Sequence, residues 1–206
     1  MPEVLHSLYG RKLGLSAGGR LLLDPAGRGG GAAGILLPNT NAGPSTALTT
    51  FTAQRAFDTY TTIPANTLEV GSVIRIRYQG IQTAVNGTDT SQFILNIGST
   101  LAASTLAVTS GTALTTSTAA AGIVNEIFHG EYELQVRTVG SSGTMVGVGI
   151  FKKVPNVEAT YAAVDDILAS TTIDTTIDQI VCVGCVYGAS SASNSCRLDF
   201  FRVIVH

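Results

Sequence analysis

Hydrophobic and polar residues alternate with period two over most of the chain beyond residue 44, which is the pattern of half-buried β-strands. In the stretch SVIRIRYQG, Ile74, Ile76 and Tyr78 fall on one side, and charged or polar residues fall on the other. The stretch EYELQVRTV repeats this pattern around Leu134. Both segments are therefore predicted to be strands with one face in a core.

Other segments extend the strand pattern to the C-terminus. GTMVGVGIF alternates Val146, Val148 and Ile150 with glycines, which predicts close backbone approach or a β-bulge. Further strand candidates are TALTTFTAQRAFDTYT, SQFILNIGS, STLAVTS, ILASTTID, QIVCVGCVYG and CRLDFFRVIV. Turn-forming residues separate them in IPANTLEVG, VNGTD, VGSSGT, KVPN and ASSASNS.

Helical periodicity is weak throughout this region. The best helix candidate, VEATYAAVDDIL, follows Pro155 and Asn156 and has room for one or two turns. About eight or nine short strands without crossover helices predict an all-β antiparallel sandwich or barrel, because parallel strands need such helices.

The first 43 residues differ from the rest. They hold a long glycine-rich run, lack sustained alternation and end in the turn-rich stretch PNTNAGPS. We interpret residues 1–43 as an extended N-terminal arm and residues 44–206 as the sandwich domain. The expected hinge consists of Gly27, Gly29, Gly30, Gly31 and Gly34.

Charge is sparse and unevenly distributed. The chain has 206 residues, of which 45% are hydrophobic and 13% charged, whereas an average soluble protein has about 25% charged residues. Such a surface packs readily against other subunits, because few charges need to be desolvated. Residues 1–35 carry four cations and two anions, and the remainder carries eight cations and twelve anions. The net charge of −2 gives no indication of nucleic acid or anionic membrane as a partner.

The N-terminal sequence and the spacing of the cysteines indicate the compartment in which the protein is made. The stretch MPEVLHSLYGRKLGL lacks the pattern of a signal peptide, and no apolar run reaches the ~20 residues that span a bilayer. Cys182, Cys185 and Cys196 are odd in number and clustered, unlike a secreted disulfide framework. We expect synthesis in a reducing cytoplasm.

The stretch GGGAAG, residues 29–34, matches the dinucleotide-binding pattern G-x-G-x-x-G. That turn requires a helix directly after the glycines, because the phosphate binds at the helix N-terminus. Here ILLP follows, and Pro38 ends any helix within a turn. The acidic residue expected about twenty positions later for the ribose would be Asp58, which lies in strand-like sequence. A flexible glycine-rich segment explains the match better.

GLSAG, residues 14–18, likewise matches the nucleophile elbow G-x-S-x-G at Ser16. That elbow joins a strand to a helix in an α/β sheet, and neither element is predicted here. His129 and His206 are available as bases, but no predicted element brings either of them to Ser16. We therefore interpret GLSAG as a loop of the arm.

Two further clusters resemble chemical sites. Cys182 and Cys185 form C-x-x-C on a predicted strand, where residues three apart point to opposite faces, so buried structural thiols explain them best. Glu131 and Glu133 share one strand face about 7 Å apart, a spacing that would suit a glycosidase pair or a cation. Cross-strand ion pairs with Arg75 and Arg77 explain them more simply. Asp165 and Asp166 form a second carboxylate pair. No enzyme activity, metal or cofactor is predicted.

Residues 61–80, 133–149 and 169–205 together resemble a family of jelly-roll virion proteins of tailed bacteriophages. TTIPANTLEVGSVIRIRYQG, residues 61–80, resembles the family's turn and following strand. ELQVRTVGSSGTMVGVG, residues 133–149, resembles its "xVRTIGxSGT" hairpin, and ASTTIDTTIDQIVCVGCVYGASSASNSCRLDFFRVIV, residues 169–205, resembles its closing strands. The resemblance covers roughly residues 45–205 and implies a jelly-roll β-sandwich of about eight strands.

Members of this family include head decoration (cement) proteins, head fibres and domains of tail fibres or spikes, and they are commonly trimeric. The resemblance, together with the short chain and leucine-rich arm, implies a cement protein on the capsid surface, made in the host cytoplasm. Its expected partners are the major capsid protein and further copies of itself. The expected capsid-binding residues of the arm are Leu5, Leu8, Tyr9, Arg11, Lys12, Leu13, Leu15 and Arg20.

Two alternatives remain open at this point. The first alternative is a fibre or spike module that binds a host receptor or glycan. The chain has no Trp and only 6% aromatic residues from which to build a platform for a sugar. The third hypothesis is a small β-sandwich hydrolase that uses Glu131 and Glu133.

Overall fold

The computed structural model describes residues 5–6, 12–15, 21–23, 34–41, 43–84, 90–101, 110–116, 123–153 and 162–206. The chain divides into two compact units, Met1–Gly34 together with His206, and Ile35–Val205. The second unit carries the long strands and the hydrophobic core.

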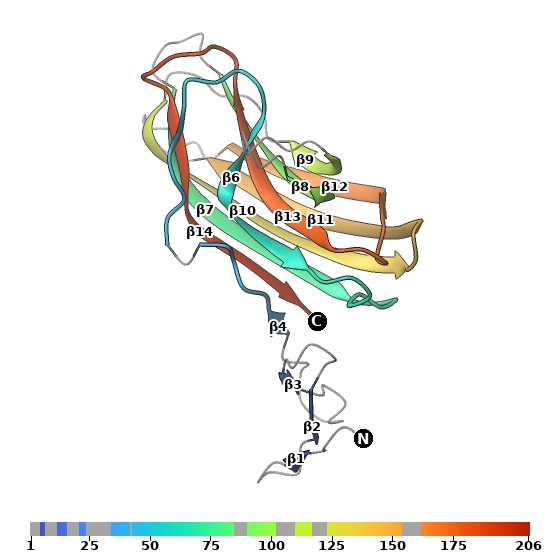
Figure 1. The fold of residues 1–206 in the computed structure, drawn as a ribbon. Coiled ribbons are helices and arrows are strands. Elements are labelled where there is room, and N and C mark those ends of the chain that lie inside the picture. The colour runs from blue at the N-terminus through green and yellow to red at the C-terminus, as the bar shows by residue number, and fades with distance from the viewer. Residues whose placement is uncertain are drawn as a thin grey trace. The chain divides into compact units, whose positions relative to one another are not determined.

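Two antiparallel sheets make up the second unit (Figure 1). The larger sheet has the order β12, β11, β10, β7, β14 and β4, and β5 also pairs with β14. Its strands are β12 (Ala162–Ile173), β11 (Gly143–Lys153), β10 (Ile123–Thr138), β7 (Val73–Ala84), β14 (Ser195–Val205), β4 (Ile35–Leu36) and β5 (Leu48–Thr49). The smaller sheet runs β6 (Arg55–Ile63), β13 (Gln179–Tyr187), β8 (Ser91–Thr100) and β9 (Ser110–Thr116).

The prediction of an all-β antiparallel jelly-roll sandwich is confirmed. The first two long strands, β6 and β7, pair with the last two, β13 and β14, so the chain is rolled up with its beginning beside its end. Nine described strands have seven or more residues, close to the predicted eight.

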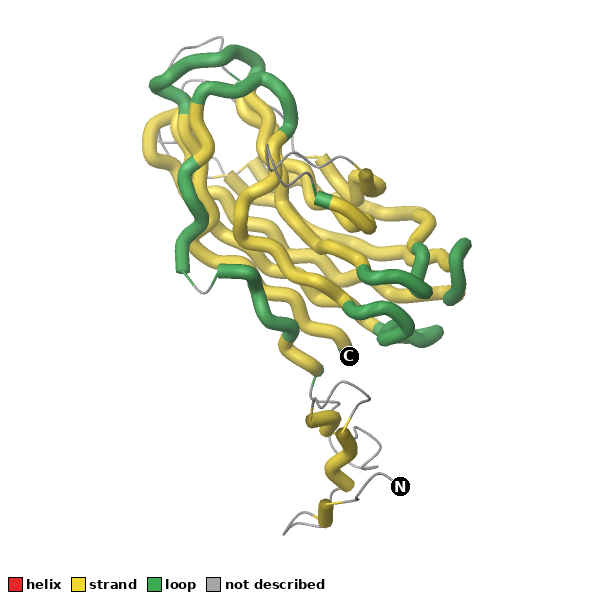
Figure 2. Tube along the Cα trace, viewed as in Figure 1, coloured by secondary structure: helices red, strands yellow, loops and turns green. Residues whose placement is uncertain are grey.

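No helix occurs within the described residues, as Figure 2 shows. The best helix candidate of the sequence, residues 157–168, falls partly on β12. There, Ala162 to Leu168 pair with β11, so ladder hydrogen bonds replace any helical turn over these residues.

The alternation of apolar residues places the core between the two sheets. In β7 the side chains of Ile74, Ile76 and Tyr78 are buried, as predicted, and Arg75 and Arg77 are exposed. The apolar set of β10 is buried as well, namely Tyr132, Leu134 and Val136.

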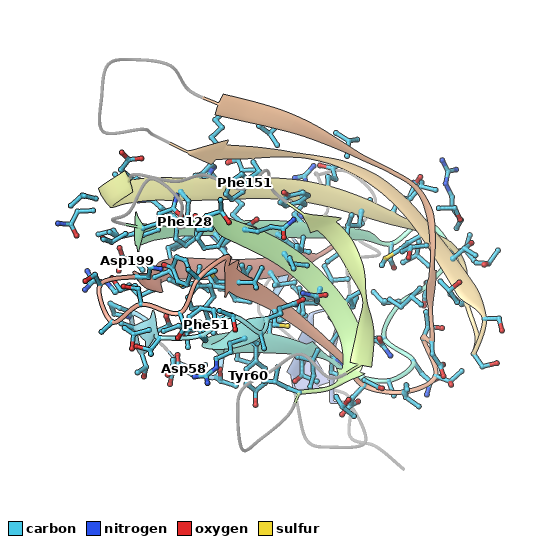
Figure 3. The ribbon with its side chains drawn as sticks, turned by 90° about the horizontal axis from the view of Figure 1, so that it is seen from above. Phe51, Asp58, Tyr60, Phe128, Phe151 and Asp199 are labelled. Atoms are coloured by element: carbon cyan, nitrogen blue, oxygen red, sulfur yellow. The ribbon has the colours of Figure 1, made fainter. Side chains whose placement is uncertain are left out.

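Aromatic rings from both sheets meet in this core. Phe93 of β8 stacks on Phe128 of β10 with ring centroids 4.0 Å apart, and Phe151 of β11 lies 5.8 Å from Phe93. Figure 3 shows Phe128 and Phe151 on adjacent strands of the larger sheet. The two sheets therefore bury one continuous aromatic layer, the main driving force for their packing.

Strand β11 has the irregularity that its glycines predicted. Its register with β12 shifts between Met145 and Gly147, which marks a β-bulge. Its glycines lie close to β10, where a Cβ on Gly147 would be 2.5 Å from the backbone oxygen of Glu133. Val148 and Ile150 consequently lie on the outer face, 63% and 38% exposed.

Residues 35–41 and 43–49, which we call the strap, run along one open side of the sandwich. The backbone N–H of Leu37 donates to Val203 O of β14 at 3.1 Å, and that of Thr40 donates to Tyr60 O of β6 at 2.9 Å. The strap therefore joins an edge of each sheet and satisfies backbone groups that would otherwise be unpaired.

The strap changes the predicted domain boundary. The sequence placed residues 1–43 in an arm outside the core, but Leu37 is only 6% exposed and belongs to the core cluster. Ile35 and Leu36 also pair with β14. The sandwich unit therefore begins at Ile35, because this apolar segment covers the open side of the sheets.

The first unit contains a small antiparallel sheet where the sequence predicted an extended arm. Its strands are β1 (Leu5–His6), β2 (Lys12–Leu15) and β3 (Leu21–Leu23), in that order. Pairing through β2 gives this segment backbone hydrogen bonds that an extended arm would lack. Among the predicted hinge residues only Gly34 is described, and Gly27, Gly29, Gly30 and Gly31 lie outside the described residues.

Candidate functional site

The register of the N-terminal sheet gathers leucines on one face. Leu5 lies opposite Leu13, and Leu13 lies opposite Leu23, so one row crosses all three strands. Leu15 and Leu21 form the next row two residues along. Because residues two apart share a face, these five leucine positions form one leucine face. His6, Lys12, Gly14 and Leu22 occupy the opposite face.

This arrangement brings together part of the predicted capsid-binding set. Leu5, Leu13 and Leu15 share the leucine face, and Lys12 lies on the other one. The remaining predicted residues, Leu8, Tyr9, Arg11 and Arg20, lie outside the described residues. The sequence showed the leucines, but only the strand register assigns them to one face.

The two glutamates of β10 are held by arginines of β7. Arg75 Nε donates to Glu133 Oε2 at 2.9 Å, and Arg77 pairs with Glu131. His129 Nε2 also lies 3.4 Å from Glu131 Oε1. The predicted cross-strand ion pairs are confirmed, and both carboxylates of the candidate catalytic pair are engaged by guanidinium groups.

The second carboxylate pair lies on the edge strand β12. Asp165 lies opposite Ile150 and Asp166 lies opposite Gly149. Adjacent residues of a strand occupy opposite faces, so these two positions do not form a pair on one face.

The three cysteines are buried and free, as predicted. Cys185 and Cys196 belong to the core cluster, and Cys182 is only 2% exposed. Burial raises the pKa of the Cys182 thiol to about 12. A thiol held in its protonated form is a poor nucleophile and a poor metal ligand, so Cys182 acts by packing.

The structure contradicts the interpretation of GGGAAG as a dinucleotide-binding turn. Gly34 is followed by strand β4 where a phosphate site needs a helix. Asp58, the candidate ribose ligand, accepts hydrogen bonds from the backbone N–H and the hydroxyl of Thr46, at 3.1 and 2.6 Å. Its carboxylate therefore fixes the strap. Ser16 and the glycines at 29, 30 and 31 lie outside the described residues.

The described part of the chain contains no candidate metal site and no candidate membrane span. Within these residues no group of three or more His, Cys, Asp or Glu side chains is arranged to hold a metal ion. The described part also contains no helix of the length and hydropathy that membrane spanning requires.

Three turns far apart in the sequence meet at one end of the sandwich, and we call them the three-turn tip (residues 64–72, 139–142 and 174–178). Thr175 joins them. Its backbone N–H donates to Gly140 O at 3.0 Å, its hydroxyl accepts from Gly140 N at 2.7 Å, and its carbonyl accepts from Asn66 N at 2.8 Å. Gly71 and Gly140 have φ of +92° and +110°, which explains glycine at both positions.

The three-turn tip exposes one apolar side chain from each turn. Val70 is 66% exposed, Val139 47% and Ile177 43%. The carboxyl groups of Glu69, Asp174 and Asp178 belong to the same turns. The sequence identified these stretches as turns, but it gave no signal that they are neighbours.

The outer face of the larger sheet carries an excess of positive charge. On strands β11, β10, β7 and β14 this face carries six cations and three anions in its described side chains. The cations are Arg75, Arg77, Arg137, Lys152, Arg197 and Arg202, and the anions are Glu131, Glu133 and Asp199. The chain as a whole has a net charge of −2, so this face is basic on an acidic protein.

Comparisons with known proteins add little to this geometry. No protein-family model matches the chain, and no curated protein has a significantly similar sequence. Among solved structures, the chain is similar to arcelin-5, a lectin-like defence protein from Phaseolus vulgaris, with 8% identity and a TM-score of 0.35. The match covers 100% of this chain and 91% of arcelin-5. At this TM-score the similarity carries no argument about function.

Proposed function

We propose that the protein is a structural component of a tailed-phage virion, a cement protein that binds the outer capsid surface and bridges major capsid subunits. The N-terminal unit is the attachment element, and the sandwich is the rigid body that it holds in place. The jelly-roll resemblance of residues 45–205 is the basis for the virion assignment.

The leucine face is the observation that carries the attachment role. Leu5, Leu13, Leu15, Leu21 and Leu23 share one face of a sheet with strands of two to four residues. A sheet this small gains little stability from its own hydrogen bonds and needs its apolar face covered. A leucine-rich face on so small a sheet therefore supports docking onto another protein.

The sandwich suits a bridging role for physical reasons. Its core is closed by two sheets and a strap, so the body resists deformation. A capsid under internal pressure gains stability from each added contact between subunits, and several copies around one symmetry axis multiply a weak contact through effective concentration. In the described part of the sandwich, the two carboxylates of the candidate catalytic pair, Glu131 and Glu133, form ion pairs with arginines of β7.

The experiment is a binding assay with capsids, prepared without decoration, of the phage that encodes the chain. Leu13→Ser places a hydroxyl on the leucine face, and Leu22→Ser makes the same change on the opposite face of the same sheet. We expect Leu13→Ser to weaken cosedimentation with capsids by about tenfold or more, since a buried leucine contributes about 1.5–3 kcal/mol. Leu22→Ser should bind like the wild type.

A second arm of the experiment removes residues 1–34. The remaining residues contain the whole described core, so the shortened protein should keep the thermal unfolding transition of the sandwich and lose capsid binding. Undiminished capsid binding by this protein would contradict the attachment role. Binding to host cells or glycans, with none to capsids, would favour the fibre or spike alternative.

A further inference from the structure

The three-turn tip and the outer face of the larger sheet are complementary surfaces. The tip combines three exposed aliphatic side chains with three carboxyl groups. The outer face carries an excess of cations, and on β14 the exposed side chain of Phe200 lies two residues from Arg202. Both surfaces belong to the sandwich unit, and the carboxyl groups of the tip are opposite in sign to the net charge of the face.

Hydrogen bonds within the three-turn tip already fix its backbone, which favours docking. Thr175 bonds to two other turns, and Gly71 N donates to Val136 O at 2.9 Å, which fixes the first turn against β10. Asp178 Oδ1 accepts from Ala65 N at 2.8 Å, so the third turn is tied to the first by a side chain as well. A preorganised surface loses little conformational entropy when it binds.

The outer face has cations without carboxylate partners. Arg202 lies opposite Arg77 in the β14–β7 register, and Arg77 pairs with Glu131 on its other side. Among the described side chains, neither Arg202 nor Lys152 has an ion pair. Like charges opposite each other on adjacent strands are destabilising, and an incoming carboxylate beside Arg202 would relieve that repulsion.

We propose that copies of the chain associate tip to face, with the three-turn tip of one copy seated on the outer face of the larger sheet of the next. Glu69 of the tip pairs with Arg202 of the neighbour, and Val70 and Ile177 cover the neighbour's Phe200, which lies two residues from Arg202 on β14. The turn at residues 139–142 continues β10 and β11 beyond their own sheet, so the tip reaches another copy and not its own outer face.

This contact uses different surfaces on the two copies. Such a heterologous contact closes into a ring when the rotation between neighbours allows it, and otherwise extends into a chain. The contact involves the sandwich alone, so it is independent of the capsid binding proposed for the N-terminal unit.

Sedimentation equilibrium of the full-length protein tests the contact. The wild type should self-associate, and Glu69→Lys should weaken association by about tenfold or more, because it places like charges together. Glu69 is exposed, and in the described chain its carboxylate forms no ion pair. The double variant Glu69→Lys with Arg202→Glu should restore association, since the charges are exchanged across the contact.

Aliphatic substitutions provide the matched control. Val70→Ser removes an exposed valine from the tip, and Val124→Ser removes one at the opposite end of β10. Only Val70→Ser should weaken association. Circular dichroism and thermal unfolding of each variant establish that the sandwich is intact, so that loss of association reports on the contact.

Several outcomes would overturn the proposal. A wild-type protein that stays monomeric at millimolar concentration would do so, as would association that is unchanged by Glu69→Lys. If Lys12→Glu restored association of the Glu69→Lys protein and Arg202→Glu did not, the partner of the tip would be the basic N-terminal unit. That result would contradict the sheet face as the partner. A monomeric Glu69→Lys protein that still binds capsids would leave the cement role standing, which distinguishes failure of one proposal from failure of the other.

Discussion

Tyr132 of β10 lies directly opposite Gly149 of β11, and its ring fills the space where a side chain at residue 149 would be. Two more pairs of this kind cross the sheet. The ring of Tyr78 covers Gly130, and the ring of Phe128 covers Gly80, again between residues paired in register. Three aromatic side chains of the core therefore lie over glycines of the neighbouring strand, which explains why glycine recurs on the inner face of this sheet.

The first prediction concerns Gly149→Ala. A Cβ at this position would overlap the ring of Tyr132, so the ring or the strand has to move. We expect a loss of about 1–3 kcal/mol in the free energy of unfolding, the usual effect of overpacking a core. Urea denaturation measures it. Gly43→Ala is the control, because no atom lies within 4 Å of the new methyl group there, and equal stability of the two variants would contradict the role of the ring.

The second prediction concerns the joint of the three-turn tip. Thr175→Val keeps the shape of the side chain but removes the hydroxyl that accepts a hydrogen bond from Gly140 N. We expect a loss of about 1–3 kcal/mol, because a partly buried N–H is left without a partner. Hydrogen exchange at the Gly140 amide should become faster. The exposed Thr172→Val should change stability by less than about 0.5 kcal/mol, and the same result for Thr175→Val would contradict the joint.

The third prediction concerns pH and Cys182. Its thiol has an ordinary pKa of 9.0, and burial raises the pKa to about 12 in the folded protein. Between these values the unfolded chain has lost the proton and the folded chain has kept it, so the free energy of unfolding falls as pH rises from 9.0 toward 12. Below pH 9.0 the thiol is protonated in both states and contributes no pH dependence.

Cys182→Ala separates this effect from other groups that titrate at high pH. The stability of the wild type should fall more steeply above pH 9.0 than that of the variant, as measured by urea denaturation at a series of pH values. Parallel curves for the two proteins would contradict the buried thiol as the cause.

The fourth prediction concerns the ion pairs on the outer face. Glu133 and Arg75 have side chains that are 55% and 54% exposed, so solvent screens their attraction. We expect Glu133→Gln to lower the free energy of unfolding by no more than about 1 kcal/mol, and by less at high salt. A loss of several kcal/mol that persists in molar salt would show that the pair is not a surface ion pair of the ordinary kind.

Much of the fold was predictable because period-two alternation reports directly on burial. Ile74, Ile76 and Tyr78 are buried as the pattern required, since a strand packed on one face has no other way to exclude them from water. The same logic predicted the ion pairs of Glu131 and Glu133 and the burial of the cysteines. The sequence did not predict that the strap packs on the core from Ile35 onward, because Leu37, one of its core residues, lies in a segment without alternation.

The sequence alone is enough to predict the fold class, the core-facing sides of the clearest alternating strands and the absence of a helix after GGGAAG, because these depend on local periodicity and on Pro38. Which distant residues are neighbours depends on the tertiary fold. Strand register brought Leu5, Leu13 and Leu23 into one row and put rings over glycines, and Thr175 joined three turns from separate parts of the chain. Such proximity depends on the pairing of whole strands, which local sequence pattern does not specify.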